Sequence, residues 1–117
     1  MDTKHHEILI QGFKDAAKAA KEAAERSPDD GGACNFDTPA FRITRANRVS
    51  ITALVAPAGL TVSEFTWFGR QKWLWLNLPN YGQGNRRTRA SQAAVDVLKQ
   101  LVAQVPGLEV NHYMQMD

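Results

Sequence analysis

The chain has few of the residues that mark whole classes of protein. It contains one cysteine in 117 residues, so no internal disulfide can form, which favours a reducing compartment. No apolar run approaches the roughly 20 residues that span a bilayer. The N-terminus, MDTKHHEILI, lacks the apolar core of a signal peptide. We therefore expect a cytoplasmic protein that does not enter a membrane.

Motifs for common cofactors are also missing. The stretch GQGN at 82–85 is not followed by the G-K-[ST] of a P-loop. It does not match the G-x-G-x-x-G fingerprint of dinucleotide-binding proteins either. No set of His, Cys, Asp and Glu has the spacing of metal ligands. The sequence thus predicts no cofactor and no bound metal, and it assigns no catalytic residue.

What the chain does have is an uneven distribution of charge. The formal net charge is +2, but residues 41–90 carry eight basic side chains against a single acidic one, Glu64. Seven of the eight basic residues are arginine. The planar guanidinium group matches phosphate and carboxylate groups better than the lysine ammonium group does. The middle of the chain is therefore where we expect an anion to bind.

Hydrophobic periodicity predicts three helices and four strands. The segment 46–58 fits both a strand and a helix. We predict a helix there, because Thr44 or Asn47 can cap its start and Gly59 can end it. The expected helices cover 5–26, 46–58 and 85–105, and the expected strands cover 33–43, 60–68, 72–78 and 108–116.

This element order predicts an α+β fold in one domain, 1–117. An N-terminal amphipathic helix, 1–28, packs on the sheet of a ferredoxin-like β-α-β-β-α-β unit, 33–116, which contains a four-stranded antiparallel sheet. Trp73 and Trp75 alternate with leucines in the third strand and should face away from the two inner helices. We expect the alanine-rich face of the first helix to cover these two tryptophans, because small residues pack well against large ones.

The stretch NYGQGNRRTR at 80–89 is the main candidate site. Its glycines let the backbone approach a ligand, and the helix that follows offers free N–H groups. Arginine at a helix start opposes the helix dipole by about 0.3–1 kcal/mol, so a negative group is expected nearby. The segment that enters the first strand should lie beside this loop. The candidate ligand-binding residues are Gly82, Gly84, Asn85, Arg86, Arg87, Arg89, Asn35 and Asp37.

Two origins for that negative group remain open. It is either an external phosphate or carboxylate, or an internal partner such as Asp29, Asp30 or the C-terminal carboxylate of Asp117. The predicted fold places a second group of arginines, Arg42, Arg45, Arg48 and Arg70, at the opposite edge of the sheet.

The aromatic alternation of KWLWLN at 72–77 resembles that of RNA-binding sheets of the RRM type, in which aromatic rings stack on bases. The RRM consensus motif itself is not present. The favoured interpretation is that the rings are core residues, covered by the first helix or by a dimer partner.

Three functions follow from these observations. The leading one is a small module that binds a phosphate-bearing small molecule or nucleic acid through the Gly/Arg loop. The second is an interaction protein that assembles through its sheet face, for example as a homodimer. The third is an enzyme with an Asn/Asp/Arg site for a phosphorylated or carboxylated substrate. Whether the protein is an enzyme stays open at this point.

Overall fold

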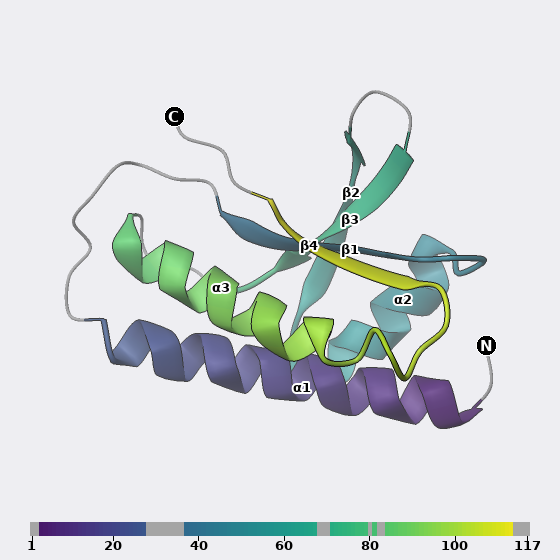
Figure 1. Ribbon diagram of the computed structural model, residues 1–117, viewed down its shortest axis with the longest axis horizontal. Helices are drawn as coiled ribbons and strands as arrows, with labels where there is room; N and C mark the ends of the chain where they lie inside the picture. The colour runs from purple at the N-terminus through teal and green to yellow at the C-terminus, as the bar shows by residue number, and fades with distance from the viewer. Residues whose placement is uncertain (1–2, 28–36, 68–70, 80, 82–83, 114–117) are drawn as a thin grey trace.

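The computed structural model describes residues 3–27, 37–67, 71–79, 81 and 84–113 (Figure 1). The chain is α+β, with an N-terminal helix and a four-stranded antiparallel sheet, as the sequence predicts. The elements in chain order are α1 (Thr3–Glu25), β1 (Thr38–Ile43), α2 (Arg48–Val55), the 3₁₀ turn η1 (Ala56–Ala58), β2 (Thr61–Trp67), β3 (Gln71–Asn77), α3 (Asn85–Lys99) and β4 (Leu108–Tyr113).

The strands lie in the order β2-β3-β1-β4. β2 pairs with β3, and β1 with β4, along their whole lengths. The two central strands pair with one another only at Ala40↔Trp75 and Phe41↔Leu74. Beyond Phe41, β1 and β3 therefore form no further backbone pairs.

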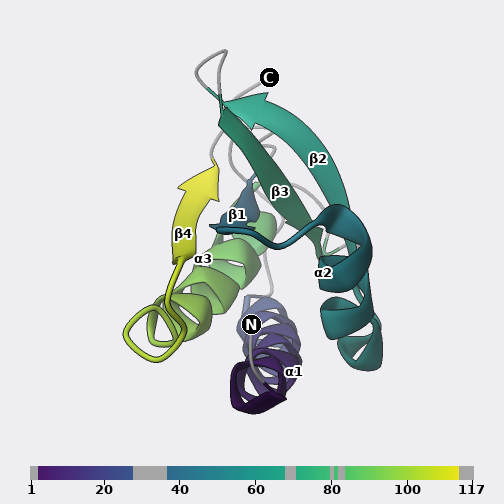
Figure 2. The same ribbon diagram turned by 90° about the vertical axis from the view of Figure 1, so that its right-hand side faces the viewer.

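All three helices lie on one side of the sheet (Figure 2). The core forms between them and the helix-facing side chains of the strands, including Phe41, Leu74 and Leu76. Trp73 and Trp75 lie outside this core cluster and point to the opposite face. The predicted alternation of leucine and tryptophan along β3 is therefore confirmed.

The prediction that the first helix covers the tryptophans is wrong. α1 packs against α3 and α2, on the helix side of the sheet. The ring of Phe13 lies 5.3 Å from that of Phe41, measured between centroids. Leu9 and Phe13 are fully buried, so α1 removes more apolar surface from water there than its alanines alone would. The alanines at 16 and 20 allow the close approach to neighbouring helices.

The helix predicted at 46–58 is confirmed as α2 followed by η1. Asn47 caps α2, because its side-chain oxygen accepts a hydrogen bond of 2.8 Å from the Ser50 N–H. Gly59 ends the segment with a φ of 75°, a conformation that glycine adopts without steric cost. The two capping residues therefore predicted the ends of this segment correctly.

The other predicted boundaries shift slightly. Of the strand predicted at 33–43, the structure shows 38–43 as β1, and 33–36 lie outside the described residues. The last helix ends at Lys99 rather than near Val105. Beyond it the N–H groups of Gln100, Leu101 and Val102 bond to carbonyl groups three residues back. These tighter turns end α3 while still allowing Val105 to be fully buried.

Candidate functional site

The first turns of α3 carry three arginines, Arg86, Arg87 and Arg89, which we call the α3 cluster. Arg86 Nε donates to the Ser27 carbonyl oxygen at 2.9 Å, and Arg89 Nη1 donates to the Ser27 hydroxyl oxygen at 3.2 Å. Arg87 Nε donates to the Asp37 carbonyl oxygen at 3.0 Å. The cluster thus joins the start of α3 to the end of α1 and to the residue that precedes β1.

Asp37 is held at the same junction by a residue that sequence reasoning missed. Thr88 donates its hydroxyl hydrogen to Asp37 Oδ2 over 2.7 Å, and the Gly84 carbonyl is a second acceptor within reach at 3.1 Å. Asp37 is only 2% exposed. The sequence does place a threonine one turn into the predicted helix. The sequence pattern does not show that its hydroxyl group meets the Asp37 carboxylate.

The remaining predicted site residues are only partly brought together. Gly84 precedes α3 with a φ of 69°, and Asn85 is the exposed first residue of the helix. Gly82 and Asn35 lie outside the described residues. The cavity between Asp37, Tyr81 and Arg87 measures about 10 Å³, which is at the lower limit for one water molecule. This cavity is therefore about the size of one water molecule.

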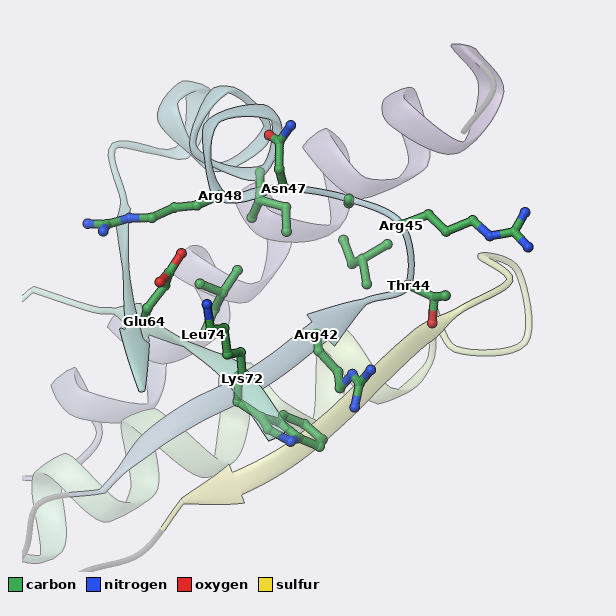
Figure 3. Close-up of a pocket in the computed structure, with 12 residues that line it drawn as sticks. Arg42, Thr44, Arg45, Asn47, Arg48, Glu64, Lys72 and Leu74 are labelled. Carbon is green, nitrogen blue, oxygen red and sulfur yellow. The ribbon is translucent and has the colours of Figure 1, made fainter. Parts of the chain in front are cut away.

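A larger cavity lies at the opposite end of β1, where β1 and β3 form no backbone pairs (Figure 3). Its volume is about 350 Å³. We call it the α2 pocket, because the turn that leads into α2 forms one of its walls. Its charged lining residues are Arg42, Arg45, Arg48, Lys72 and Glu64. The uncharged lining residues are Ile43, Thr44, Ala46, Asn47, Ile51, Trp73 and Leu74.

The predicted grouping of arginines at this edge is confirmed for Arg42, Arg45 and Arg48, and Arg70 lies outside the described residues. The guanidinium carbon of Arg42 lies 6.0 Å from the Trp73 ring centroid. Arg42 Nε also lies 3.8 Å from the Glu109 carboxylate, a separation at which an exposed ion pair contributes little. Four cationic side chains against the carboxylate of Glu64 give the lining a formal charge of +3.

The arginines of the α2 pocket do not converge on one point. Figure 3 shows Arg45 and Arg48 extending in opposite directions from the start of α2. Both are exposed, and exposed side chains change rotamer within picoseconds to nanoseconds. Their long side chains can therefore turn towards an anion that enters the pocket.

Arg45 has an unusual backbone conformation. Its φ is 66°, and it is the one residue other than glycine with a positive φ in the described part of the chain. It also lines a second cavity, of about 420 Å³, together with His5, His6 and Ser50. Strained residues of this kind concentrate at binding and catalytic sites. Arg45 therefore lines both cavities, and its backbone has a conformation that is unfavourable for a residue other than glycine.

Two titratable groups away from the α2 pocket are affected by their surroundings. Burial raises the pKa of Tyr81, and the carboxylate of Glu25 adds to this effect. Burial lowers the pKa of His112 on β4. No group of three or more His, Cys, Asp and Glu in the described ranges is placed to hold a metal ion. None of the helices in those ranges is both long and apolar enough to cross a membrane.

The chain matches no protein-family model, and comparison with curated proteins and with solved structures returned no match.

Proposed function

We propose that the protein binds a phosphate-bearing anion, and that the anion occupies the α2 pocket. The observation that carries this proposal is a cavity of about 350 Å³ whose lining contains three arginines and a lysine against one glutamate. Charge-assisted hydrogen bonds from arginine to phosphate are stronger than neutral ones, and arginine can make two in parallel. The positive φ of Arg45 supports the same location.

The Gly/Arg loop at 82–89 is the second candidate for this binding function. The free N–H groups of the first turn of α3 and the positive φ of Gly84 favour it. Against it, Arg86, Arg87 and Arg89 each donate a hydrogen bond to an acceptor inside the protein. The cavity beside Arg87 is also far smaller than the α2 pocket. We therefore place the ligand in the α2 pocket.

We also assign the chain after α1 to the ferredoxin-like, split βαβ arrangement. The element order β1-α2-β2-β3-α3-β4 and the central position of β1 and β3 support this assignment. In such a sheet the start and the end of β1 lie at opposite ends of the strands. The arginines near each end of β1 are therefore separated.

The test is a thermal melt at low salt, with and without tripolyphosphate. A ligand present at about 100 times its Kd adds roughly 2.7 kcal/mol to the free energy of unfolding. We expect Arg45→Asn/Arg48→Gln to weaken binding at least about tenfold, because each lost charge-assisted bond is worth about 1.5–3 kcal/mol. Asparagine tolerates positive φ at position 45, so this variant removes charge without adding backbone strain.

Two controls separate the sites. Lys18→Gln/Lys21→Gln removes the same charge from exposed positions on α1 and should leave the affinity within about twofold. Arg86→Gln/Arg87→Gln removes two positive charges from the α3 cluster. If the α3 variant abolishes the shift and the pocket variant does not, the Gly/Arg loop is the site. If tripolyphosphate produces no shift at any concentration, the proposed function is wrong.

A further inference from the structure

The α2 pocket contains one carboxylate among its cationic side chains, that of Glu64. Glu64 lies on β2 opposite Leu74 of β3, and Lys72 precedes Leu74 by two residues on the same face of that strand. Because Leu74 belongs to the core, this face is the helix side of the sheet. Figure 3 shows Glu64 and Arg48 on one side of the pocket, whereas Arg45 extends away on the other side. The carboxylate therefore shares its side of the pocket with two cations.

The Glu64 carboxylate has no partner within the fold. In the described part of the chain, the side chains of Glu64, Arg48 and Lys72 take part in no hydrogen bond or ion pair. Lys72 lies diagonally across the two strands from Glu64, a position from which a long side chain can reach its neighbour. These charged groups are therefore available to a ligand, and they include a hydrogen-bond acceptor as well as donors.

A carboxylate in an anion-binding pocket discriminates between ligands. It repels a ligand that carries only phosphate groups, and it accepts hydrogen bonds from a ligand that also carries donors. An ammonium group is a poor candidate for the donor, because four cationic side chains against Glu64 leave a formal charge of +3 on the lining. A neutral hydroxyl group meets no such repulsion. Since a carboxylate has two oxygens, two neighbouring hydroxyl groups can donate to it at once.

We propose that the ligand of the α2 pocket carries a vicinal diol beside its phosphate group, and that Glu64 accepts the hydrogen bonds of the diol. The inference rests on the proposed function, because the cations supply the phosphate contacts, and it adds the class of ligand. That class is a phosphorylated sugar, either free or as the ribose of a nucleotide.

The size of the pocket agrees with such a ligand. Its volume of about 350 Å³ lies within the range of small-molecule sites, so a sugar fits beside the phosphate group. Dinucleotide-binding folds also recognise ribose with an acidic side chain that binds a hydroxyl group. The α2 pocket has the same chemical pairing of an acid for the hydroxyl groups with positive groups for the phosphate.

The experiment compares two ligands that differ in one hydroxyl group, with Kd measured by isothermal titration calorimetry at low salt. Adenosine monophosphate carries the diol, and deoxyadenosine monophosphate has the same base and phosphate group without the second hydroxyl group. We expect the ribonucleotide to bind about tenfold more tightly, since a hydrogen bond to a charged group contributes about that factor. The comparison uses the unaltered protein, so it does not depend on the folding of any variant.

Substitution of Glu64 should change two affinities in opposite directions. Glu64→Gln should weaken the binding of adenosine monophosphate at least about threefold, because the charge-assisted bonds are lost. It should tighten the binding of tripolyphosphate at least about twofold, because a like charge is removed. Glu22→Gln, which removes the same charge from an exposed position on α1, should change neither affinity. A change of the same sign for both ligands in Glu64→Gln would overturn the role of this carboxylate.

Ribose 5-phosphate identifies the source of the sugar, because it carries the diol without a base. An affinity close to that of adenosine monophosphate supports a free sugar phosphate as the ligand. An affinity at least about tenfold weaker supports a nucleotide whose base adds contacts of its own.

Failure of this inference differs from failure of the proposed function. Binding of tripolyphosphate, together with equal affinities for the two nucleotides or with no binding of either, overturns the diol and leaves phosphate binding in the α2 pocket intact. No binding of tripolyphosphate, of either nucleotide or of ribose 5-phosphate overturns both.

Discussion

Asp37 and Thr88 illustrate how single side chains hold the start of α3. The Asp37 carboxylate is almost fully buried, and the Thr88 hydroxyl group donates to it at 2.7 Å. Removing one partner of a buried hydrogen bond costs the desolvation of the group left behind, about 1–3 kcal/mol, and more when that group is charged. The bond is therefore worth more to stability than an exposed bond of the same length.

The corresponding prediction is that Thr88→Val lowers the free energy of unfolding by about 1–3 kcal/mol. Valine keeps the shape of threonine and removes only the hydroxyl group. Thr52→Val is the matched control, because Thr52 also donates to the carbonyl four residues back, Arg48, but is exposed. Urea unfolding monitored by tryptophan fluorescence measures both variants. Equal losses in the two would show that the bond to Asp37 adds nothing.

The arginines of the α3 cluster were foreseen from the sequence only as residues that need a negative partner. The described bonds of Arg86 and Arg87 lead to the carbonyl oxygens of Ser27 and Asp37. A backbone carbonyl acceptor cannot be predicted from residue types, because every residue carries a carbonyl group. Charge pattern identified the residues, but only the positions of the backbone could identify these acceptors.

At the scale of elements, the contact between α1 and the turns that follow α3 involves a residue without a side chain. Gly12 is buried in the middle of α1. A Cβ atom built at this position would overlap the Leu101 side chain, with Cγ at 3.3 Å. Glycine in the interior of a helix costs about 1 kcal/mol relative to alanine. The close approach to Leu101 explains why the helix keeps it.

We predict that Gly12→Ala is more favourable to stability in a Leu101→Ala background than in the unaltered chain. In the unaltered chain the Leu101 side chain must shift to admit the new Cβ atom, and this shift offsets part of the gain of about 1 kcal/mol in helix propensity. In a Leu101→Ala background the overlap disappears, and the same substitution should stabilise by up to about 1 kcal/mol. Denaturant titrations of the four proteins give this double-mutant cycle. An equal effect in both backgrounds would contradict the proposed contact.

Element positions were predictable where periodicity and capping residues agreed. Asn47 and Gly59 marked the ends of the α2 segment correctly. The apolar stripe of α1 was also visible, with Leu9, Phe13 and Ala16 on one face. Its partner was not predictable, because a small-residue face fits against tryptophans or against helices equally well. In the structure Phe13 packs against Phe41 within the core cluster on the helix side of the sheet.

At the scale of the whole molecule, stability depends on pH through His112. Burial lowers its pKa below the ordinary value of 6.5, the Lys99 charge adds to this lowering, and the carboxylates of Asp37 and Asp96 oppose it. Between the folded and unfolded pKa values the unfolded chain binds more protons, so the free energy of unfolding rises with pH. The contribution is complete above the unfolded pKa and is lost as pH falls through the folded one.

We therefore expect the urea midpoint to fall as pH decreases from about 7.5 to 5.5, a window above the range in which ordinary carboxylates titrate. His112→Gln should flatten this dependence. His6→Gln, at an exposed position on α1, should retain it. A pH dependence that persists unchanged in the His112 variant would assign it to another group.

The pairing of α1 with α3 also bears on how the chain is made. α1 leaves the ribosome before α3, and the helix against which it mainly packs is complete only at Lys99. Synthesis at about 5–20 residues per second leaves Leu9 and Phe13 without this partner for about 5–15 s. During synthesis the nascent chain therefore presents an amphipathic helix with an uncovered apolar face, which is a surface suited to transient capture by a chaperone.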